Sequence, residues 1–463
     1  MKIKKIVKKS EDLKPWVVAV DMGYGHQRAA YPLRTIAHSG LIINANNYQG
    51  ITPQDSAIWR KQREFYEFIS RFKSVPLVGD TAFQIFDQFQ RIPDFYPRRD
   101  LSAPSFQVLQ VARVVRKGWG RPLMEKLAKS PRSLVTTFFM PAIAAEQFGY
   151  PGEIFVIICD ADCSRAWVSA NPQSSRINYL APSWRVVERL QMYGVPAERI
   201  FYTGFPLPTE NLGNHKFDRL RADLARRMSK LDECGVYQKG HSSEWLSGLL
   251  GKQVPSKSVS RPLELTFAVG GVGAQREIGS EIIYYLADEV RSGQIKLHLV
   301  AGIHNDVRQF FEQAVTKLRL TSYLHAGQID IIFADSKAEY FRKFNLALRT
   351  TDVLWTKPSE LSFYCALGMP IIIAPPIGSQ EDFNRAWLHD LSAGIDQEDP
   401  KYVSEWLFDW LHSGRLAARA MHGFLYAQKT GSHTVMEVVA GRFPPVSAMG
   451  SQRSSLFFNC PIV

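Results

Sequence analysis

Short apolar runs alternate with helical patterns through most of the chain. In the first half, the pattern predicts strands at residues 16–20, 40–45, 133–139 and 154–159, a helix at 57–73, and a strand–helix unit ending near residue 204. In the second half, it predicts strands at 263–269, 297–301, 329–333, 353–356 and 371–374, with a helical segment between successive strands. Continuously apolar strands separated by helices are typical of parallel sheets, so the pattern predicts an α/β fold.

This rhythm is interrupted once, at residues 210–262, which are charged and then rich in Gly, Ser and Lys. A chain of 463 residues is also too long for one ordinary core. We therefore expect an N-terminal Rossmann-like domain at 1–209, a connection with helices of its own at 210–262, and a second Rossmann-like domain at 263–430. A tail follows at 431–463.

Composition narrows the class of protein. With 45% hydrophobic, 12% aromatic and 22% charged residues, the chain has the composition of a soluble globular protein. It contains no run of 18 apolar residues that could span a membrane, and the basic N-terminus lacks the apolar core of a signal peptide. The five cysteines are scattered without a second pair at metal-ligand spacing, which indicates reduced thiols in a cytoplasmic protein.

The net charge of +12 lies in the first part of the chain. Residues 1–134 carry 23 of the 56 basic and 11 of the 44 acidic residues, whereas the remainder carries 33 of each. An aromatic helical face at 59–73 and a second basic cluster at 98–121 fall in this part. Such a surface suits the anionic headgroups of a membrane, although a helix with its aromatic side chains in the core and its arginines in solvent has the same pattern. Base-stacking motifs are absent, so no nucleic acid is expected as partner.

Two glycine-rich turns occupy the first strand–helix junction of each half, at residues 23–26 and 270–275. Glycine lets the backbone bend tightly and brings N–H groups close to a phosphate, while the helix that follows adds the positive end of its dipole. The turn at 270–275 has three glycines and no acidic residue, which favours a diphosphate there; tight packing alone would also explain it. Neither turn matches the Walker pattern, and the dinucleotide fingerprint lacks its third glycine.

His26 is the most chemically suggestive residue of the first turn. A histidine at the carboxyl end of a strand can act as a general base or orient an acceptor hydroxyl. A histidine at a helix start can equally be bonded to the backbone.

In order along the chain, these pieces resemble a known group, the lipid-directed GT-B glycosyltransferases. Its members include monogalactosyldiacylglycerol synthases, processive diacylglycerol glucosyltransferases and the peptidoglycan N-acetylglucosaminyltransferase. The segment GYGHQRAA at 23–30 resembles the family's entry loop, and 160–167 with 190–196 and 200–206 resembles its "D…W…GVP…GFP" run. The turn at 270–275, LVAG at 299–302, TDVLWTKP at 351–358, ALGMP at 366–370 and GSQEDFN at 378–384 resemble later motifs.

The resemblance implies two Rossmann-like domains facing each other across a cleft and a metal-independent transferase without a cofactor. A nucleotide-sugar, usually UDP-linked, would bind the second domain as co-substrate. A lipid or polyprenyl-type acceptor would bind the first, at the cytoplasmic face of the inner membrane. The implied catalytic residues are His26, Asp160 and Asp162; the implied acceptor-binding residues are Gly23, Gly25 and Trp167. The implied donor-binding residues are Gly270, Gly271, Gly273, Ala274, Gln275, Gly302, Lys357, Ser359, Glu360, Gln380, Glu381 and Asn384.

One departure from the family concerns the donor ribose. Members normally carry a Glu seven residues before the proline of the "GxP" turn, and this chain has Phe363 there. Glu360 could replace that carboxylate, or Ser359 could simply cap the helix. Two alternatives to a transferase therefore stay open: a nucleotide-sugar epimerase or hydrolase of the same fold, which would need carboxylates near the anomeric carbon, and a catalytically degenerate binding protein.

Overall fold

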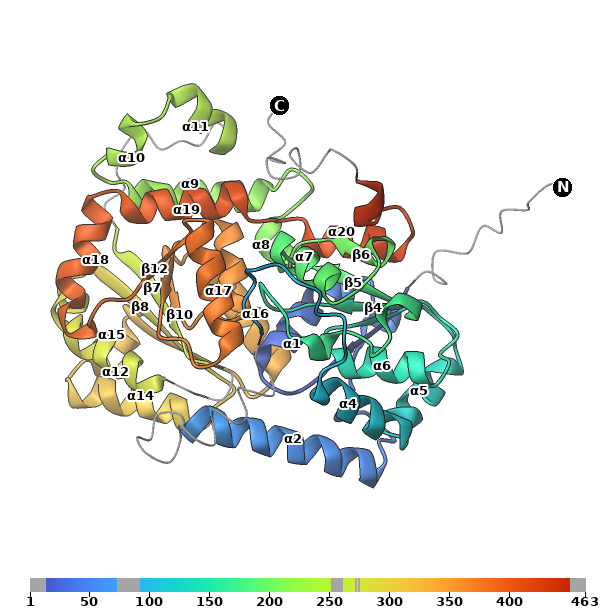
Figure 1. The fold of residues 1–463 in the computed structure, drawn as a ribbon. Helices are drawn as coiled ribbons and strands as arrows, with labels where there is room; N and C mark the ends of the chain where they lie inside the picture. Colours follow the sequence, from blue (N-terminus) through green and yellow to red (C-terminus); the bar gives the residue numbers. More distant parts are fainter. Residues whose placement is uncertain (1–13, 73–91, 251–260, 271–272, 274, 450–463) are drawn as a thin grey trace. The chain divides into compact units, whose positions relative to one another are not determined.

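The computed structural model describes residues 14–72, 92–250, 261–270, 273 and 275–449, which form two compact units (Figure 1). The first unit comprises the chain up to residue 206 and the segment that begins at residue 430; the second comprises residues 207–429. Each unit contains one six-stranded sheet in which every neighbouring pair of strands is parallel.

The first sheet has the strand order β2-β1-β3-β4-β5-β6. Its strands are β1 (Trp16–Ala19), β2 (Ile42–Asn44), β3 (Leu134–Thr136), β4 (Ile154–Ile157), β5 (Ile177–Ala181) and β6 (Ile200–Tyr202). The α-helices of this unit are α1 (Tyr24–Ala30), α2 (Pro53–Phe72), α4 (Phe106–Arg116), α5 (Arg121–Ala128), α6 (Phe139–Gln147), α7 (Trp184–Met192) and α20 (Gly431–Val439). Because β1 lies between β2 and β3, the strand order reverses between β1 and β3. Such a reversal is where open α/β sheets bind ligands.

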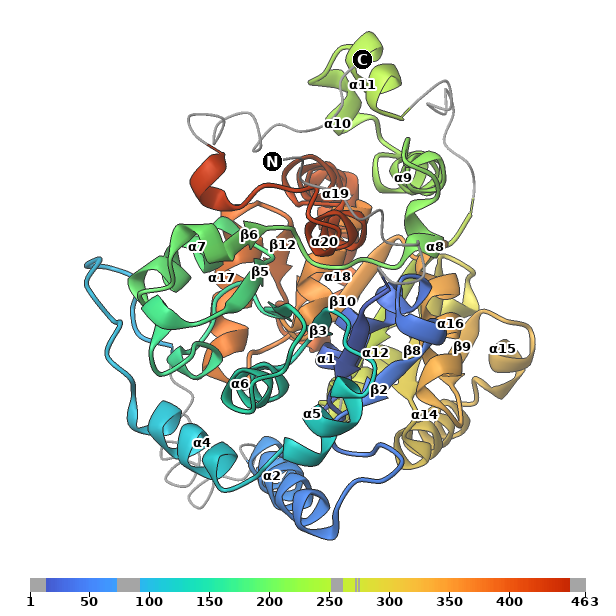
Figure 2. The same ribbon diagram turned by 90° about the vertical axis from the view of Figure 1, so that its right-hand side faces the viewer.

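The core of the first unit draws on both ends of the chain. Val17 of β1, Val135 of β3 and Phe155 of β4 are buried together with Val435 and Val438 of α20. The segment expected as the start of a C-terminal tail thus packs its apolar side chains against the first sheet. Figure 2 shows α20 beside this unit, although more than 220 residues separate it from β6 along the chain.

The second sheet has the order β12-β11-β10-β7-β8-β9. Its strands are β7 (Leu263–Ala268), β8 (Ile295–Gly302), β9 (Ile329–Phe333), β10 (Val353–Thr356), β11 (Ile371–Ile373) and β12 (Gly394–Asp396). The α-helices are α8 (Thr209–Leu212), α9 (Asp218–Leu231), α10 (Val236–Lys239), α11 (Ser243–Leu250), α12 (Arg276–Tyr285), α13 (Ala287–Arg291), α14 (Asn305–Lys317), α15 (Thr321–His325), α16 (Lys337–Leu348), α17 (Ser379–Asp390), α18 (Val403–His412) and α19 (Arg415–Tyr426). A 3₁₀-helix, η7 (Glu360–Leu367), follows β10.

This strand order is that of a doubly wound Rossmann sheet, and it reverses between β7 and β10. Right-handed crossovers place the helices between β7, β8 and β9 on one face, and α16, which returns the chain to β10, on the other. Helix α16 packs on β8 and β9. The loops after β7 and β10 therefore diverge at the carboxyl edge of the sheet.

Helix α9 belongs to the second unit and fastens the ends of several of its elements. Leu220, Leu224 and Met228 recur at helical spacing and are buried. Arg227, also buried, donates hydrogen bonds to carbonyl oxygens that end α16, precede β10 and end η7, those of Leu348, Thr351, Leu367 and Gly368. Within the segment expected as a connection, α9 is thus bonded to elements of the second unit.

Most expected strands are observed within one or two residues of their predicted bounds, and β9 and β10 coincide with them. Two Rossmann-like units in one chain are the composition of a GT-B fold, so the predicted fold class is confirmed. Among the described residues, none of the helices has the length and apolar character needed to cross a bilayer.

Candidate functional site

Gly270 and Lys357 meet where the second sheet reverses. Gly270 lies two residues after the end of strand β7, and Lys357 directly follows β10, the neighbouring strand. A Cβ atom on residue 270 would lie 2.8 Å from Cε of Lys357, so glycine is what lets the lysine side chain lie against this turn. The lysine is 13% exposed. A backbone turn and a cation are thus brought together at the edge where such sheets bind phosphate esters.

Glu381 and Asn384 of α17 hold the neighbouring loops in place. Glu381 forms an ion pair with Lys357 and accepts a hydrogen bond of 2.8 Å from the Ile377 N–H. Asn384, fully buried, donates to the carbonyl oxygen of Pro358 at 3.2 Å. Two roles were open to Glu381 and Asn384: contact with sugar hydroxyls, or support of the loop. These bonds show that both side chains support the loop.

Gln275 links the glycine turn to the loop that follows β11. It takes a left-handed conformation (φ 66°) just before α12, and its Nε2 donates to the carbonyl oxygen of Pro375 at 2.7 Å. Three loops at one edge of the sheet, those after β7, β10 and β11, are therefore tied to one another. Gly271 and Ala274, predicted in the same turn, lie outside the described residues.

The remaining predicted donor residues lie at the same carboxyl edge. Gly302 ends β8 with φ +68°, and Gly273 has φ +74°, a conformation that favours glycine at both positions. Ser359 precedes η7 without capping it through its side chain, and Glu360 begins η7, half-buried. Gln380 is also half-buried, in the first turn of α17.

Phe363, which occupies the position of the family's ribose-binding glutamate, is part of the core. It is buried within η7, and its ring lies 4.8 Å from the ring of Trp387 on α17. The aromatic pair packs η7 against α17, a role that a carboxylate could not fill without losing its solvation.

In the first unit, His26 lies in the first turn of α1, just after β1. Gly23 precedes this helix with φ +103°, a conformation accessible to glycine. The ring of His26 contacts Phe138, with centroids 4.9 Å apart, and lies 6.0 Å from the ring of Trp167. Phe138 follows β3, so His26 and Phe138 come from the two strands between which the first sheet reverses. Gly25 lies beside His26 in the same turn of the helix.

Asp160 and Asp162 follow β4 and differ in their surroundings. Asp162 is buried, and both of its carboxylate oxygens accept hydrogen bonds from Arg189 of α7, at 2.9 and 2.8 Å. Its Oδ1 also accepts the Cys163 N–H. Asp160 is half-buried. Asp162 thus fastens the loop to α7, which leaves Asp160 as the more accessible carboxylate.

Two further features were not among the predicted site residues. Asn46 clamps the β1 turn: its Oδ1 accepts the Asp21 N–H, and its Nδ2 donates to the Asp21 carbonyl oxygen. Phe139 lies beside Trp167, with ring centroids 5.6 Å apart. Phe138 and Phe139 could have been found from their place just after β3, because β3 is one of the two strands between which the order of the first sheet reverses. No cluster of three or more potential metal ligands occurs within the described ranges.

Comparisons with known proteins add the following. A family model described as "Domain of unknown function (DUF6938)" matches residues 252–330, the part that contains β7 and β8. No curated protein matches the sequence. Among solved structures, MurG of Acinetobacter baumannii is 13% identical, covers 92% of this chain and 99% of its own, and gives a TM-score of 0.42.

Two further solved structures are similar at the same level. The UDP-GlcNAc 2-epimerase of Neisseria meningitidis, bound to UDP-GlcNAc, is 11% identical over 78% of this chain and 88% of its own, with a TM-score of 0.42. The S. aureus MnaA–UDP structure is 10% identical over 80% and 88%, with a TM-score of 0.40. Identities this low carry no information about substrate, so the chemistry of this chain must be argued from its own residues.

Proposed function

We propose that the protein is a metal-independent glycosyltransferase that moves a sugar from a nucleotide-sugar, UDP-linked in the resembling family, to a lipid or polyprenyl-type acceptor. The observation that carries the proposal is the meeting of the Gly270 turn with Lys357 at the reversal of the second sheet. Backbone N–H groups and a poorly solvated ammonium together suit a diphosphate. The resembling solved proteins include enzymes that bind UDP or UDP-GlcNAc.

In this proposal the first unit supplies the acceptor site. His26 assists deprotonation of the acceptor hydroxyl, and the aromatic rings of Phe138 and Trp167 hold its imidazole in place. Asp160 is the alternative base. An acceptor carried by the cytoplasmic face of the inner membrane agrees with the concentration of positive charge in residues 1–134.

A catalytically degenerate binding protein is the second candidate, and one observation favours it. Phe363 is packed on Trp387, so the usual ribose carboxylate is missing from the position where the resembling family has it. An epimerase or hydrolase would draw on the carboxylates of Asp160, Asp162, Glu360 and Glu381. It has less support, because Asp162 and Glu381 are engaged by Arg189 and Lys357.

The test is a thermal-shift screen of the full chain against UDP-, GDP-, CDP- and dTDP-sugars at millimolar concentration. A ligand at 100 times its Kd stabilises the folded state by about 2.7 kcal/mol, so the matching nucleotide should raise Tm clearly. Release of free nucleotide in the presence of a lipid acceptor then separates a transferase from a binding protein. The absence of any shift would remove both candidates.

A further inference from the structure

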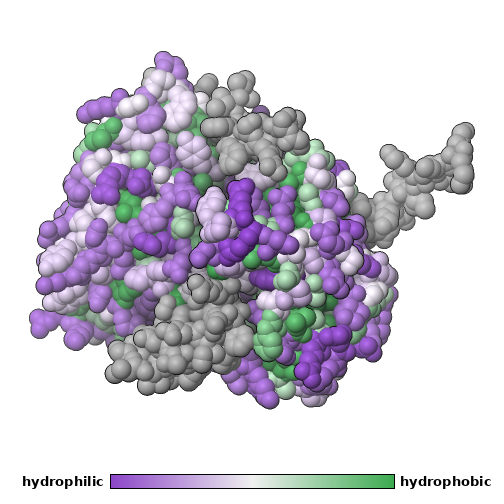
Figure 3. Space-filling view, viewed as in Figure 1, coloured by the Kyte–Doolittle hydropathy of each residue, from purple (hydrophilic) through white to green (hydrophobic). Residues whose placement is uncertain are grey.

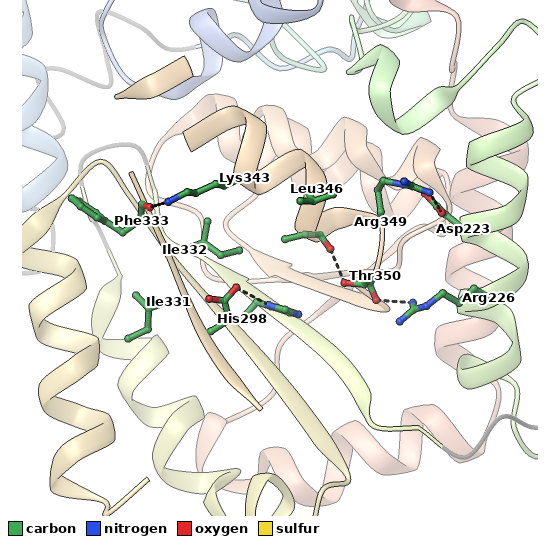
Figure 4. A pocket seen from close by; sticks show the side chains of 12 residues that line it. Asp223, Arg226, His298, Ile331, Ile332, Phe333, Lys343, Leu346, Arg349 and Thr350 are labelled. Carbon is green, nitrogen blue, oxygen red and sulfur yellow. Dashed lines mark hydrogen bonds and ion pairs between the residues drawn. The ribbon is translucent and has the colours of Figure 1, made fainter. Parts of the chain in front are cut away.

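A cavity of about 580 Å³ lies in the second unit between β8, β9, α9 and α16 (Figure 4). None of the residues predicted to bind the donor lines it. Strand β9 is the edge strand of its sheet, and α16 packs over β8 and β9, so the cavity opens along this edge. The site proposed for the nucleotide-sugar does not account for it.

The lining of the cavity has a mainly apolar end and a charged end, and Lys343 lies at the mainly apolar end, where its Nζ donates to the Phe333 carbonyl oxygen at 3.0 Å. Figure 4 shows Phe333, Ile332 and Ile331 gathered at one end, and Arg226, Arg349 and Asp223 at the other. Leu346 of α16, which is 59% exposed, lies between the two ends. A cavity with one apolar and one charged end fits a ligand that is itself amphipathic.

At the charged end, the arginine side chains are more exposed than their carboxylate partners. The side chains of Arg226 and Arg349 are 31% and 37% exposed. Their carboxylate partners Asp223, Glu264 and Asp352 are 12%, 10% and 0% exposed. A ligand that enters this end therefore meets guanidinium groups first.

The two arginines also retain hydrogen-bond donors. Arg349 gives Nε and Nη2 to Asp223, each at 3.1 Å, and its Nη1 has no acceptor among the described residues. Arg226 gives Nη1 to the Thr350 carbonyl oxygen at 2.7 Å and Nη2 to Glu264 at 2.5 Å. Because a guanidinium has five N–H donors, both side chains can accept a further anion without giving up these bonds.

We propose that this cavity binds a small amphipathic anion, with a phosphate or carboxylate group at Arg349 and Arg226 and an apolar body against Phe333, Ile332 and Leu346. Asp330, 54% exposed on β9, belongs to the same cavity and is bonded to His298. Its carboxylate opposes a second negative charge on the ligand, which makes a single anionic group the better fit. The site is separate from the nucleotide-sugar site and goes beyond the proposed function.

The first experiment is calorimetric titration of the full chain with hexyl phosphate and with hexanoate, which distinguish a phosphate from a carboxylate head. Inorganic phosphate, which has only the anionic group, and 1-hexanol, which has the apolar chain without the charge, are the control probes. One of the amphipathic anions should bind at least about tenfold more tightly than either control probe, because only it uses both ends of the cavity. Equal affinity for the control probes and the amphipathic anions, or no binding by any probe, overturns the proposal.

The second experiment uses variants with opposite expectations. Arg349→Gln should weaken binding about tenfold through loss of a charge-assisted hydrogen bond. Asp223→Asn should strengthen it several-fold, since it removes the carboxylate that competes for Arg349. Arg342→Gln, on the same helix but paired with Glu339 and outside the cavity, should leave affinity unchanged.

The opposite signs separate the site from damage to the fold. Weaker binding in Asp223→Asn as well as in Arg349→Gln would contradict an anion site at this end. The nucleotide-induced rise in Tm should be the same in all three variants, so loss of the anion site and failure of the proposed function give different results.

Discussion

At the scale of single residues, the two aspartates that follow β4 have separate tasks. Asp162 lies in the interior with Arg189 across from it, and neither side chain is exposed. Removing one partner of a buried ion pair leaves the other charge uncompensated. Asp160, two residues earlier, is half-buried.

We therefore expect Asp162→Asn to lower the free energy of unfolding by about 3–5 kcal/mol, because Arg189 keeps its charge in the interior. Asp160→Asn should lower it by less than about 1 kcal/mol and should instead reduce turnover if Asp160 is the alternative base. Urea denaturation of both variants measures the difference. Equal losses of stability would show that Asp160 and Asp162 contribute equally to the stability of the fold.

His26 permits a separation of proton transfer from packing. His26→Ala should reduce kcat by about 100-fold or more if the imidazole is the base. His26→Phe keeps an aromatic ring against Phe138 and Trp167 but cannot exchange a proton, so it should lose the same activity while keeping the stability of the parent. A loss of only a few-fold in both variants would assign His26 to positioning.

At the scale of elements, the apolar pattern predicted ten of the twelve strands. The two it did not predict are β6 and β12, and β12, with the sequence GID, has only one apolar side chain among its three residues. The place of the glycines and of Lys357 at the carboxyl edge of the second sheet was predictable, because turn chemistry is local. The engagement of Asp162 by Arg189 and of Phe363 by Trp387 was not, because each pair joins residues more than 20 positions apart.

The Gly270 turn can be tested by adding one methyl group. Gly270→Ala places a Cβ 2.8 Å from Cε of Lys357, so the lysine must move away from the turn. We expect nucleotide affinity to fall about tenfold, as for the loss of a charge-assisted hydrogen bond, and stability to fall to the extent that the displaced lysine leaves Glu381, its partner in a buried ion pair. Gly248→Ala, where nothing lies within 4 Å of the new Cβ, is the matched control. Unchanged affinity in Gly270→Ala would separate the turn from the diphosphate site.

Three neighbouring strands of the second sheet share a charged triad. His298 of β8 faces Glu264 of β7 through Nε2 at 3.2 Å and Asp330 of β9 through Nδ1 at 3.4 Å. Burial by itself would lower the pKa of His298, but the hydrogen bonds to Asp330 and Glu264 outweigh it and raise the pKa. Burial likewise opposes ionisation of Glu264, yet its bonds to His298 and Thr350 and the charges of Arg226 and Lys296 lower its pKa to about 2.

The triad should make stability depend on pH in two directions. The His298 contribution is complete below its unfolded pKa of about 6.5 and is lost as pH rises through the raised folded pKa. The Glu264 contribution is complete above about 4.3 and is lost as pH falls towards 2. His298→Gln should therefore cost more unfolding free energy at pH 6 than at pH 9, measured by urea denaturation. An equal cost at both values would mean that the imidazole is neutral in the fold.

At the scale of the whole molecule, the net positive charge lies in residues 1–134, which belong to the first unit, since basic and acidic residues balance in the remainder. The face shown in Figure 3 has hydrophobic residues in small patches among hydrophilic ones. Helix α4 combines both kinds of exposed side chain: Phe106 and Leu109 near its start, and Arg113 and Arg116 near its end. Residues 106, 109, 113 and 116 recur at helical spacing, so apolar and basic groups share one face.

We expect this face of α4 to contact anionic lipid, because it combines exposed apolar and basic side chains. Each basic side chain near such a membrane contributes about 1 kcal/mol, and a buried Phe or Leu about 1.5–3 kcal/mol. We expect the full chain to co-sediment with phosphatidylserine vesicles and not with neutral phosphatidylcholine vesicles. It should pellet less at about 0.5 M salt than at about 0.1 M, because screening becomes strong over this range. The double variant Phe106→Ser/Leu109→Ser should lose at least about tenfold in partitioning.

Tyr284→Ser is the control for that experiment, because it removes a similarly exposed aromatic side chain from the second unit. It should pellet like the parent chain. If the chain pellets equally with neutral and anionic vesicles, the positive charge of the first unit is not what attracts it. If it pellets with neither, the proposal of a membrane-embedded acceptor is wrong, and the acceptor must reach the protein in solution. The exposed apolar side chains of α4 then contact something other than lipid.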